Sequence, residues 1–361
     1  MVSRMSHTFE DLDRHLGRPG SRLVMTLGAI DRLAGRRQAL VESRPTQLEA
    51  VRRVAVVNSI ESSNAIEDIV VSRRRIEALA EHSGEPTDWP ESEIAGYLHV
   101  LELLHRSSKD IAFEPRHVMQ LHGYLGRYTE DRSAGHWKKL DNTVMEILPD
   151  GTSRVRFQPV ATDLTPKAMD ELHAAFARAE ESGEYHWLLL VAAYVLDFLT
   201  IHPFRDGNGR MSRLITIWLL YRGGYGVVRY VSLERLIDQS RDSYYRALSA
   251  STAGWHEGQH DLGPWVDYFV GIVHLAHVEL EQLTEDLGTR GRKQRAVRRS
   301  VDEFIGDLFS LQDLRQANPG VSDATLRQVL RELNAEGSIA LEGRGRGAKW
   351  RRVSRPGKRA P

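Results

Sequence analysis

The chain has 361 residues, a formal net charge of zero, 41% hydrophobic residues and 27% charged residues. This composition is typical of a soluble globular protein with about two or three domains, and the neutral total favours no class of partner. Because the sequence has no cysteine, disulfide frameworks, thiolate zinc sites and a cysteine nucleophile are excluded, and a reducing compartment is expected. The N-terminus has no apolar signal segment, and the most apolar run is too short for a membrane span and contains Asp197. We therefore expect a cytoplasmic protein with no membrane partner.

Helical periodicity dominates the sequence up to about residue 288. Apolar residues recur every three or four positions, and Pro90, Pro115 and Pro166 lie at or near expected helix starts, where a missing N–H costs little. Segments 185–201 and 211–224 are apolar on nearly all sides, as helices in the centre of a domain are. The other helices are expected in residues 45–68, 90–106, 114–128 and 165–181. This part of the chain is therefore expected to be mainly α-helical.

Residues 137–160 break the helical pattern. Segments 143–148 and 153–158 alternate apolar or β-branched residues with polar ones, and the Pro-Asp-Gly sequence at 149–151 is typical of a turn. The pattern predicts a β-hairpin. With no sheet to complete its edges, such a hairpin could accept an incoming peptide strand. The alternative is a connecting flap with no binding role.

The chain changes character near Thr289, and residues 290–361 hold 17 lysines and arginines against 8 aspartates and glutamates. The elements expected there are a basic linker at 289–299, short helices in 300–309, 310–320 and 322–337, and two strands around a Gly/Arg loop. Good N-cap residues and a glycine stop support the last two helices.

Three short helices followed by a basic hairpin resemble a winged helix-turn-helix domain, which we expect in residues 289–361. The helix Asp323–Ala335 would then enter the major groove, with Arg327 and Arg331 as base-reading candidates. The loop with Arg344 and Arg346 would be the wing that lies on the phosphates. Nucleic acid is therefore an expected partner of this region. The alternative is a dimerisation or protein-docking module with solvated basic residues, and a homodimer is compatible with either reading.

The most informative stretch is HPFRDGNGRMSR, residues 202–213, which lies between the two most apolar helices. Its Gly-Asn-Gly sequence at 207–209 precedes a helix start, where unpaired N–H groups and the helix dipole favour an anion and glycines allow close approach. Arg210 and Arg213 are three residues apart, so they share a face of the following helix and add forked donors suited to phosphate. These residues predict a polyphosphate site.

Two further residues of the stretch suggest chemistry at that site. The carboxylate of Asp206 would repel phosphates unless a cation stood between them, so Mg²⁺ is implied. His202, at the end of the preceding helix, has an imidazole that can accept a proton near neutral pH. The set supplies a base, a metal ligand and an anion site but no nucleophile, which must come from a second substrate.

This stretch resembles the signature of the Fic family, His-x-Phe-x-Asp/Glu-Gly-Asn-Gly-Arg-x-x-Arg, and every defining position is met. The resemblance spans roughly residues 50–285, including the flanking helices, the hairpin and the SYYRALSAS stretch. It implies a Fic-type helical bundle with the hairpin as a flap beside the site. The implied domains are an N-terminal helical region with an inhibitory helix (1–90), a catalytic core (91–288) and a winged-helix-like domain (289–361).

Fic enzymes mostly transfer AMP from ATP to a Ser, Thr or Tyr hydroxyl of a protein, and the resemblance implies this activity here, with ATP as co-substrate and Mg²⁺ as cofactor. His202 would deprotonate the target hydroxyl, Phe204 would anchor the loop in the core, and Asp206 would hold Mg²⁺ on the α- and β-phosphates. Tyr244 and Tyr245 would lie near the adenine, although aromatic pairs at helix ends are commonly core residues. The hairpin would align the target segment by strand addition.

The remaining signature residues would bind the phosphates. Gly207, Asn208 and Gly209 would form the anion hole, with Asn208 steadying the α-phosphate. Arg210 and Arg213 would hold the β- and γ-phosphates. The resemblance thus implies catalysis by positioning and charge neutralisation.

A second segment, SSNAIED at 62–68, resembles the family's inhibitory motif, Ser/Thr-x-x-x-Glu-Gly/Asn. Ser63 and Glu67 are four residues apart on one helix face, and taken alone they would be a solvated helix end. The resemblance implies that Glu67 pairs with Arg213 in the place of the γ-phosphate and blocks productive ATP binding. Asp68 stands where the family has Gly or Asn, which leaves open a different helix end or an altered pairing.

Several alternatives remain at this point. In some relatives the same glutamate helps water to remove AMP, so a bifunctional enzyme that also de-AMPylates its target is one of them. Other relatives transfer phosphate, UMP or phosphocholine with the same phosphate site, but the inhibitory Glu67 favours AMP. Outside the enzyme class, the C-terminal region could make the chain a DNA-binding regulator whose Fic domain senses nucleotide. The expected protein partners are an unidentified target and the enzyme itself.

Overall fold

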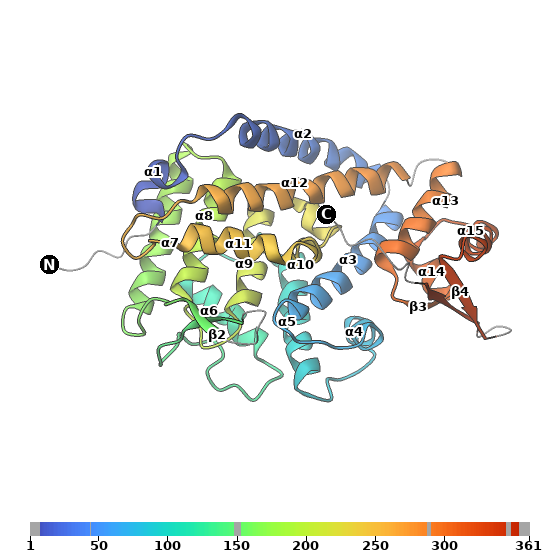
Figure 1. Ribbon diagram of the computed structural model, residues 1–361, viewed down its shortest axis with the longest axis horizontal. Coiled ribbons are helices and arrows are strands. Elements are labelled where there is room, and N and C mark those ends of the chain that lie inside the picture. Colours follow the sequence, from blue (N-terminus) through green and yellow to red (C-terminus); the bar gives the residue numbers. More distant parts are fainter. Residues whose placement is uncertain (1–7, 44, 148–152, 287–289, 344–347, 354–361) are drawn as a thin grey trace.

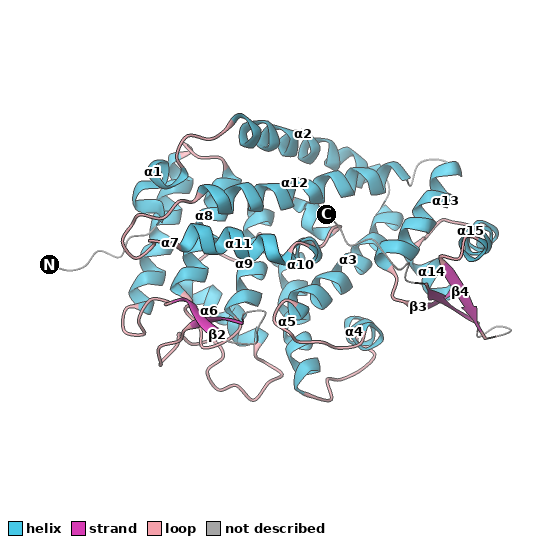
Figure 2. Cartoon of the chain, in the orientation of Figure 1, coloured by secondary structure: helices cyan, strands magenta, loops and turns pink. Residues whose placement is uncertain are grey.

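The computed structural model describes residues 8–43, 45–147, 153–286, 290–343 and 348–353. Helices make up most of the described chain, and strands occur as a small hairpin beside the helical core and as a sheet near the C-terminal end (Figures 1 and 2). The expected mainly α fold is confirmed. Among the helices of the described residues, none combines the length and the apolar character needed to cross a bilayer.

Two buried helices form the centre of the molecule and carry the signature stretch between them. α8 (Trp187–Ile201) and α9 (Asn208–Arg222) are buried along nearly their whole length, as their apolar sequences predict. α8 ends at His202, whose φ of 52° lies in the left-handed region, and Gly207, with a φ of 75°, is the N-cap of α9. α9 therefore begins inside the Gly-Asn-Gly sequence and not after it.

The other helices of the core surround this pair, and α2 runs along α12 on one side of the molecule (Figure 1). They are η1 (Thr8–Asp11), α1 (Leu12–Leu16), α2 (Ser21–Ser43), α3 (Pro45–Ala65), α4 (Arg73–Ala80), α5 (Trp89–Ser107), α6 (Pro115–Leu125), α7 (Thr165–Ser182), η2 (Gly226–Arg229), α10 (Leu233–Gln239), α11 (Arg241–Thr252) and α12 (Gly263–Asp286). One continuous apolar cluster joins them to α8 and α9. The four helices expected around the central pair are all present, and each of them has proline in its first turn.

The expected hairpin is present as β1 (Val144–Ile147) and β2 (Ser153–Phe157). The strands are antiparallel, and a β-bulge follows Val144. The turn sequence at 149–151 lies outside the described residues. In the part of the chain that the structure describes, β1 and β2 pair only with each other, so the hairpin is a two-stranded unit.

The C-terminal unit has its own apolar cluster, centred on residues such as Val297, Phe309 and Leu330. Its elements are α13 (Arg290–Arg299), η3 (Ser300–Phe304), β3 (Leu308–Ser310), α14 (Leu311–Ala317), α15 (Asp323–Ala335), β4 (Ile339–Glu342) and β5 (Lys349–Arg352). The strands form one antiparallel sheet in the order β3-β5-β4. The last two expected helices and the two strands after them are present, and β3 adds a third strand to the sheet. The expected Gly/Arg loop with Arg344 and Arg346 lies outside the described residues.

Two sequence-based expectations for this unit are wrong. The basic segment expected as a linker is the helix α13, because Val297 is fully buried in the unit's core while Arg298 pairs with Glu332 and Glu336 of the neighbouring α15 segment. The segment 300–309, expected to be a helix, is a π-helical turn followed by β3, whose Phe309 lies opposite Trp350 of β5. Tertiary packing overrides the local pattern in both cases.

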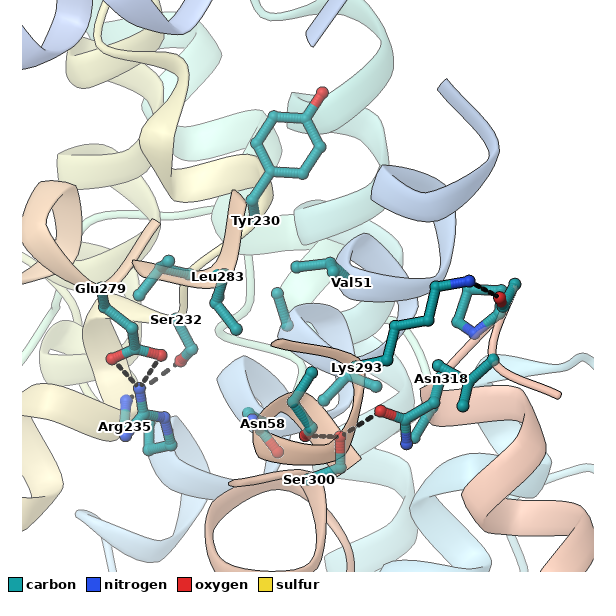
Figure 3. Close-up of a pocket in the computed structure, with 18 residues that line it drawn as sticks. Val51, Asn58, Tyr230, Ser232, Arg235, Glu279, Leu283, Lys293, Ser300 and Asn318 are labelled. Carbon is teal, nitrogen blue, oxygen red and sulfur yellow. Dashed lines mark hydrogen bonds and ion pairs between the residues drawn. The ribbon is translucent and has the colours of Figure 1, made fainter. Parts of the chain in front are cut away.

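The C-terminal unit packs through α14 against α3, the helix that leads to the 62–68 segment, and through α13 against α12. Figure 3 shows the pocket at this contact, which is lined by Val51 and Asn58 of α3 together with Lys293 and Ser300 of the C-terminal unit. Ser300 is hydrogen-bonded to Asn318 within the C-terminal unit at 2.9 Å. One face of α3 thus meets the C-terminal unit while other residues of the same helix reach α9.

Candidate active site

His202 leads the stretch that joins α8 to α9. Its Nδ1 lies 3.2 Å from the carbonyl oxygen of Leu199, which can only accept, so Nδ1 carries the proton and Nε2 keeps a free lone pair. Burial, with a smaller contribution from the ammonium group of Lys138, lowers the pKa of His202 to about 4. The imidazole is therefore neutral at physiological pH and ready to accept a proton, although its pKa is below the ordinary value that the sequence suggested.

The aromatic residue of the stretch is buried in the core. Phe204 has no exposed surface and stacks on the ring of His122, with ring centroids 3.7 Å apart. Its backbone N–H donates to Asn208 Oδ1 at 2.9 Å, and Asn208 Nδ2 donates back to the Phe204 carbonyl at 2.8 Å. The Asn208 side chain therefore ties the start of α9 to the backbone of Phe204. The sequence did not suggest this structural role.

Residues just before the hairpin bind the carbonyl groups of the loop. The buried Lys138 donates its backbone N–H to the Pro203 carbonyl at 2.8 Å and its ammonium to the Ile201 carbonyl at 3.2 Å. Asn142 Nδ2 donates to the Phe204 carbonyl at 3.0 Å. Burial lowers the pKa of Lys138 to about 8. With its acceptors satisfied in this way, the backbone of the loop is held in one conformation.

His122 of α6 makes a comparable contact at the end of the loop. Its Nδ1 accepts from the Gly135 backbone N–H at 2.9 Å, so its Nε2 carries the proton and donates to the Asp206 carbonyl at 3.1 Å. Burial lowers the pKa of His122 to about 4, which keeps the neutral tautomer that both bonds require. Nothing in the sequence singled out His122, Lys138 or Asn142.

The two arginines of the signature have different partners. Arg213 is 3% exposed, and it donates to Ser63 Oγ, to the Ser63 carbonyl and to Glu67 Oε1, each at 2.8 Å. Arg210 is equally buried and forms an ion pair with Glu93 of α5, a partner that the sequence did not suggest. Each guanidinium is thus held by a carboxylate from another helical segment.

Glu67 lies directly against the start of α9. It follows the end of α3 in a turn, and a Cβ atom placed on Gly209 would lie only 2.0 Å from its Oε1. A larger residue at position 209 would push this carboxylate out of the place that it occupies here. An anionic group therefore stands at the N-terminus of α9, where helix geometry favours an anion.

The predicted site residues fall into two neighbouring cavities. The first is lined by His202, Gly209, Arg213, Glu67, Tyr244, Tyr245 and the hairpin residues Val144, Met145, Arg154, Arg156 and Phe157, among others. The second is lined by Asp206, Gly207 and Arg210 with Glu93, His122 and Trp89, among others. The base, the inhibitory pair and the tyrosine pair therefore share a cavity with the hairpin, whereas Asp206 and Arg210 line the second cavity.

The tyrosine pair on α11 is largely within the protein. Tyr244 is 4% exposed, and burial raises its pKa. Tyr245 is half-buried, and the guanidinium of Arg156 on the hairpin lies 4.7 Å from its ring centroid. Tyr245 thus forms part of the contact between α11 and the hairpin, while Tyr244 is mainly a core residue.

The residues present fit a magnesium ion that a nucleotide brings with it. Asp206 has a side chain that is 72% exposed, with the Arg210 guanidinium 3.6 Å away. The described residues contain no cluster of three or more His, Asp or Glu side chains that could hold a metal alone. Mg²⁺ in phosphoryl-transfer sites is commonly held by one or two carboxylates together with substrate phosphates, and a single exposed carboxylate meets that need.

Part of the chain matches a known protein family. The model of the Fic/DOC family matches residues 112–220, which include α6, the hairpin, α7, α8 and most of α9. These residues are a Fic/DOC family domain. The resemblance seen in the signature stretch is thereby confirmed.

Curated relatives of the Fic domain include the proteins named "Protein adenylyltransferase Fic" from Drosophila grimshawi and Drosophila mojavensis. Each is 34% identical over 90 residues, which are 25% of this chain. The match spans only 16% of the length of these relatives.

Solved structures share the fold around the Fic domain. A Fic family protein from Desulfovibrio desulfuricans G20 has a TM-score of 0.61 at 22% identity, over 95% of this chain and 99% of that chain. A Fic domain containing signaling protein from Bacteroides thetaiotaomicron has a TM-score of 0.58 at 18% identity, over 71% of this chain and 95% of that chain. Fic-1 from C. elegans has a TM-score of 0.54 at 21% identity, over 71% and 70% of the two chains. At these identities the likeness shows the fold, and the expected Fic-type helical fold is confirmed.

Proposed function

We propose that the Fic domain transfers AMP from ATP to a Ser, Thr or Tyr hydroxyl of a protein, and that Glu67 restrains this activity. The observation that carries the proposal is the Glu67 carboxylate, which stands against Gly209 and pairs with Arg213 at 2.8 Å. A protein carboxylate in that place marks an anion site at the N-terminus of α9. The names of the curated fly relatives support adenylyl transfer as the chemistry of such a site.

In the proposed reaction, the lone pair on His202 Nε2 takes the proton of the target hydroxyl as the hydroxyl oxygen attacks the α-phosphorus of ATP. The bond from the α-phosphorus to the bridging oxygen breaks, and pyrophosphate leaves. The N–H groups at the start of α9 stabilise the negative charge on the phosphate oxygens. Asp206 would hold Mg²⁺, which supplies further neutralisation of phosphate charge.

The restraint follows from the two competing partners of Arg213. In the resting protein its guanidinium is engaged by Ser63 and Glu67. A triphosphate that entered the same cavity would have to displace the Glu67 carboxylate before its terminal phosphate could reach Arg213. The enzyme is therefore proposed to have low activity until the segment after α3 moves.

The test is label transfer with the purified chain, Mg²⁺ and ATP labelled at the α-phosphate. His202→Ala removes the base, so transfer to protein is expected to fall by about 10²–10⁴-fold while ATP binding changes little. ATP labelled at the γ-phosphate serves as the matched control, because a phosphate transferase would label protein from it. Transfer by the His202→Ala variant at the wild-type rate would show that the base assignment is wrong.

Removal of AMP from a modified target is a second candidate activity, favoured by one observation. The Glu67 side chain is 36% exposed and lines the same cavity as His202, so a water molecule could reach both groups. A target that carries AMP should then release it in the presence of the wild-type chain but not of Glu67→Gly. Equal release by both would remove this candidate.

Nucleic-acid binding by the C-terminal unit is proposed separately, because Arg327 and Arg331 are exposed on one side of α15. Replacing both arginines by alanine should weaken binding of duplex DNA in a mobility-shift assay, by about 1–3 kcal/mol for each arginine that reads a base. A shift that is the same for both proteins would favour a protein-docking role.

A further inference from the structure

Asn142 occupies a junction between the catalytic loop and the hairpin. It lies two residues before β1, and its Nδ2 is 3.4 Å from the His202 carbonyl and 3.0 Å from the Phe204 carbonyl. Its Oδ1 accepts from the Lys138 ammonium at 2.9 Å. One side chain therefore contacts the backbone of the proposed base, the buried anchor of the loop and a buried cation.

These partners fix the orientation of the amide. The two carbonyl oxygens can only accept, so they must face the NH₂ group, and the ammonium can only donate, so it must face the oxygen. A carboxylate of the same shape would suit Lys138 but would place an oxygen against both carbonyls. Asparagine is therefore the side chain that satisfies all three partners at once.

The backbone of Asn142 joins the same junction to the far strand of the hairpin. Its carbonyl accepts from Gln158 Nε2 at 3.1 Å, and Gln158 directly follows the end of β2. The preceding residue, Asp141, accepts from the N–H and the hydroxyl of Thr162 at 2.8 and 2.7 Å. Both ends of the hairpin are thus tied together within one residue of the side chain that holds the His202 backbone.

We propose that Asn142 is a positioning residue that sets the place of the hairpin relative to His202, and that it thereby decides whether a protein hydroxyl or water receives the AMP group. This proposal rests on the proposed adenylyl transfer. Hairpin and base line one cavity, and a rigid link between them keeps a strand held by the hairpin at a fixed distance from Nε2. Misplacement by about 1 Å at such a site can cost about a hundredfold in rate.

The two outcomes use the same leaving group and differ in the acceptor. With a protein hydroxyl, a phosphodiester bond forms at the α-phosphorus, pyrophosphate leaves and the proton goes to His202. With water, the products are AMP and pyrophosphate. Water needs no hairpin to reach the base, so a displaced hairpin lowers transfer to protein more than it lowers hydrolysis.

The experiment measures the ratio of AMP bound to protein to free AMP, in the Glu67→Gly background and with α-labelled ATP. The protein acceptors are the enzyme itself and the proteins of a cell lysate. N142D is expected to lower the ratio by about tenfold or more. The KM for ATP should change by less than about twofold, because no phosphate-binding group is altered.

A second variant guards against a folding defect of N142D. Gln158→Ala removes the link to β2 from an exposed position and leaves the loop contacts of Asn142 in place. It should lower the same ratio while the rate of free AMP formation stays near that of the parent. Val155→Thr is the matched control: Val155 lies on β2, is 59% exposed and has a side chain that makes no hydrogen bond, so this variant should keep the parent ratio.

The outcomes separate the two proposals. If the Glu67→Gly parent forms neither labelled protein nor free AMP, the proposed adenylyl transfer fails. If the parent is active and Gln158→Ala or a folded N142D keeps the parent ratio, even with a lower total rate, Asn142 merely supports the loop and the inference is overturned.

Discussion

Replacing Glu67 by glycine is the most direct way to test the proposed restraint. The change removes the carboxylate that pairs with Arg213 at 2.8 Å and lies against Gly209. It does not leave Arg213 without partners, because the Ser63 hydroxyl and carbonyl still accept from the guanidinium. The site for the terminal phosphate should then be open while the rest of the loop keeps its contacts.

The size of the effect follows from that ion pair. A hydrogen bond to a charged group contributes about 1.5–3 kcal/mol, and the 36% exposure of the Glu67 side chain places this pair at the lower end of the range. A penalty of about 1–2 kcal/mol for displacing the carboxylate corresponds to about a 5–30-fold gain in transfer when it is removed. Removal of the carboxylate as a steric obstacle should add to this gain.

The assay is incorporation of α-labelled ATP into protein at a fixed, subsaturating ATP concentration, with the ATP dissociation constant measured in parallel. Glu67→Gln is the matched control, because its amide oxygen can still accept from Arg213 and its volume still fills the place beside Gly209. It should give a smaller rise than Glu67→Gly. Equal labelling by the wild type and both variants would refute the reasoning, since the pair would then have no influence on ATP binding.

Two further predictions follow from the same contacts. Gly209→Ala in the Glu67→Gly background should lower transfer by about tenfold or more, because the methyl group fills the place of the anion. The melting temperature should be no lower than that of the parent, since Ala favours a helix by about 1 kcal/mol over Gly. Full activity would show that position 209 does not border the phosphates. The free energy of unfolding should fall between pH 7 and pH 5, because burial lowers the pKa of His105 to about 3 and those of His122 and His173 to about 4, whereas the unfolded chain binds these protons near pH 6.5. Stability is then full above pH 6.5 and is lost as the pH falls toward 4, by about 1–2 kcal/mol for each histidine at pH 5, and urea unfolding curves that coincide at pH 7 and pH 5 would contradict this.

The sequence predicted the features that depend on local chemistry. Apolar periodicity was enough to predict the central helices, and alternation with a turn sequence was enough for the hairpin. The order of glycines and charges predicted an anion-binding helix start, and the structure places the Glu67 carboxylate there. Each of these follows from residues that are close together in the sequence or from a fixed motif.

Other parts of the site depend on contacts between distant segments. Arg210 can pair with Glu93 only because α5 packs on α9. The sequence near either residue does not predict this pairing. In the sequence, nothing distinguishes Lys138 from a surface lysine, yet its side chain is buried and donates to a loop carbonyl. The two-cavity arrangement likewise depends on how the loop turns between α8 and α9. Sequence patterns indicate which faces are apolar but not which buried polar groups will meet.

Asp68 shows how backbone geometry explains a departure from a motif. Its φ is 59°, a left-handed conformation that glycine adopts freely and that Asn and Asp adopt more readily than other residues. The Gly or Asn usual at this position is therefore a requirement of the turn after α3, and aspartate meets it. The side chain is 91% exposed and lies 3.7 Å from Arg241, which also donates to the Ala65 carbonyl at 2.6 Å. Its added negative charge is thus balanced by Arg241 away from Arg213, so the substitution leaves the pairing of Glu67 intact.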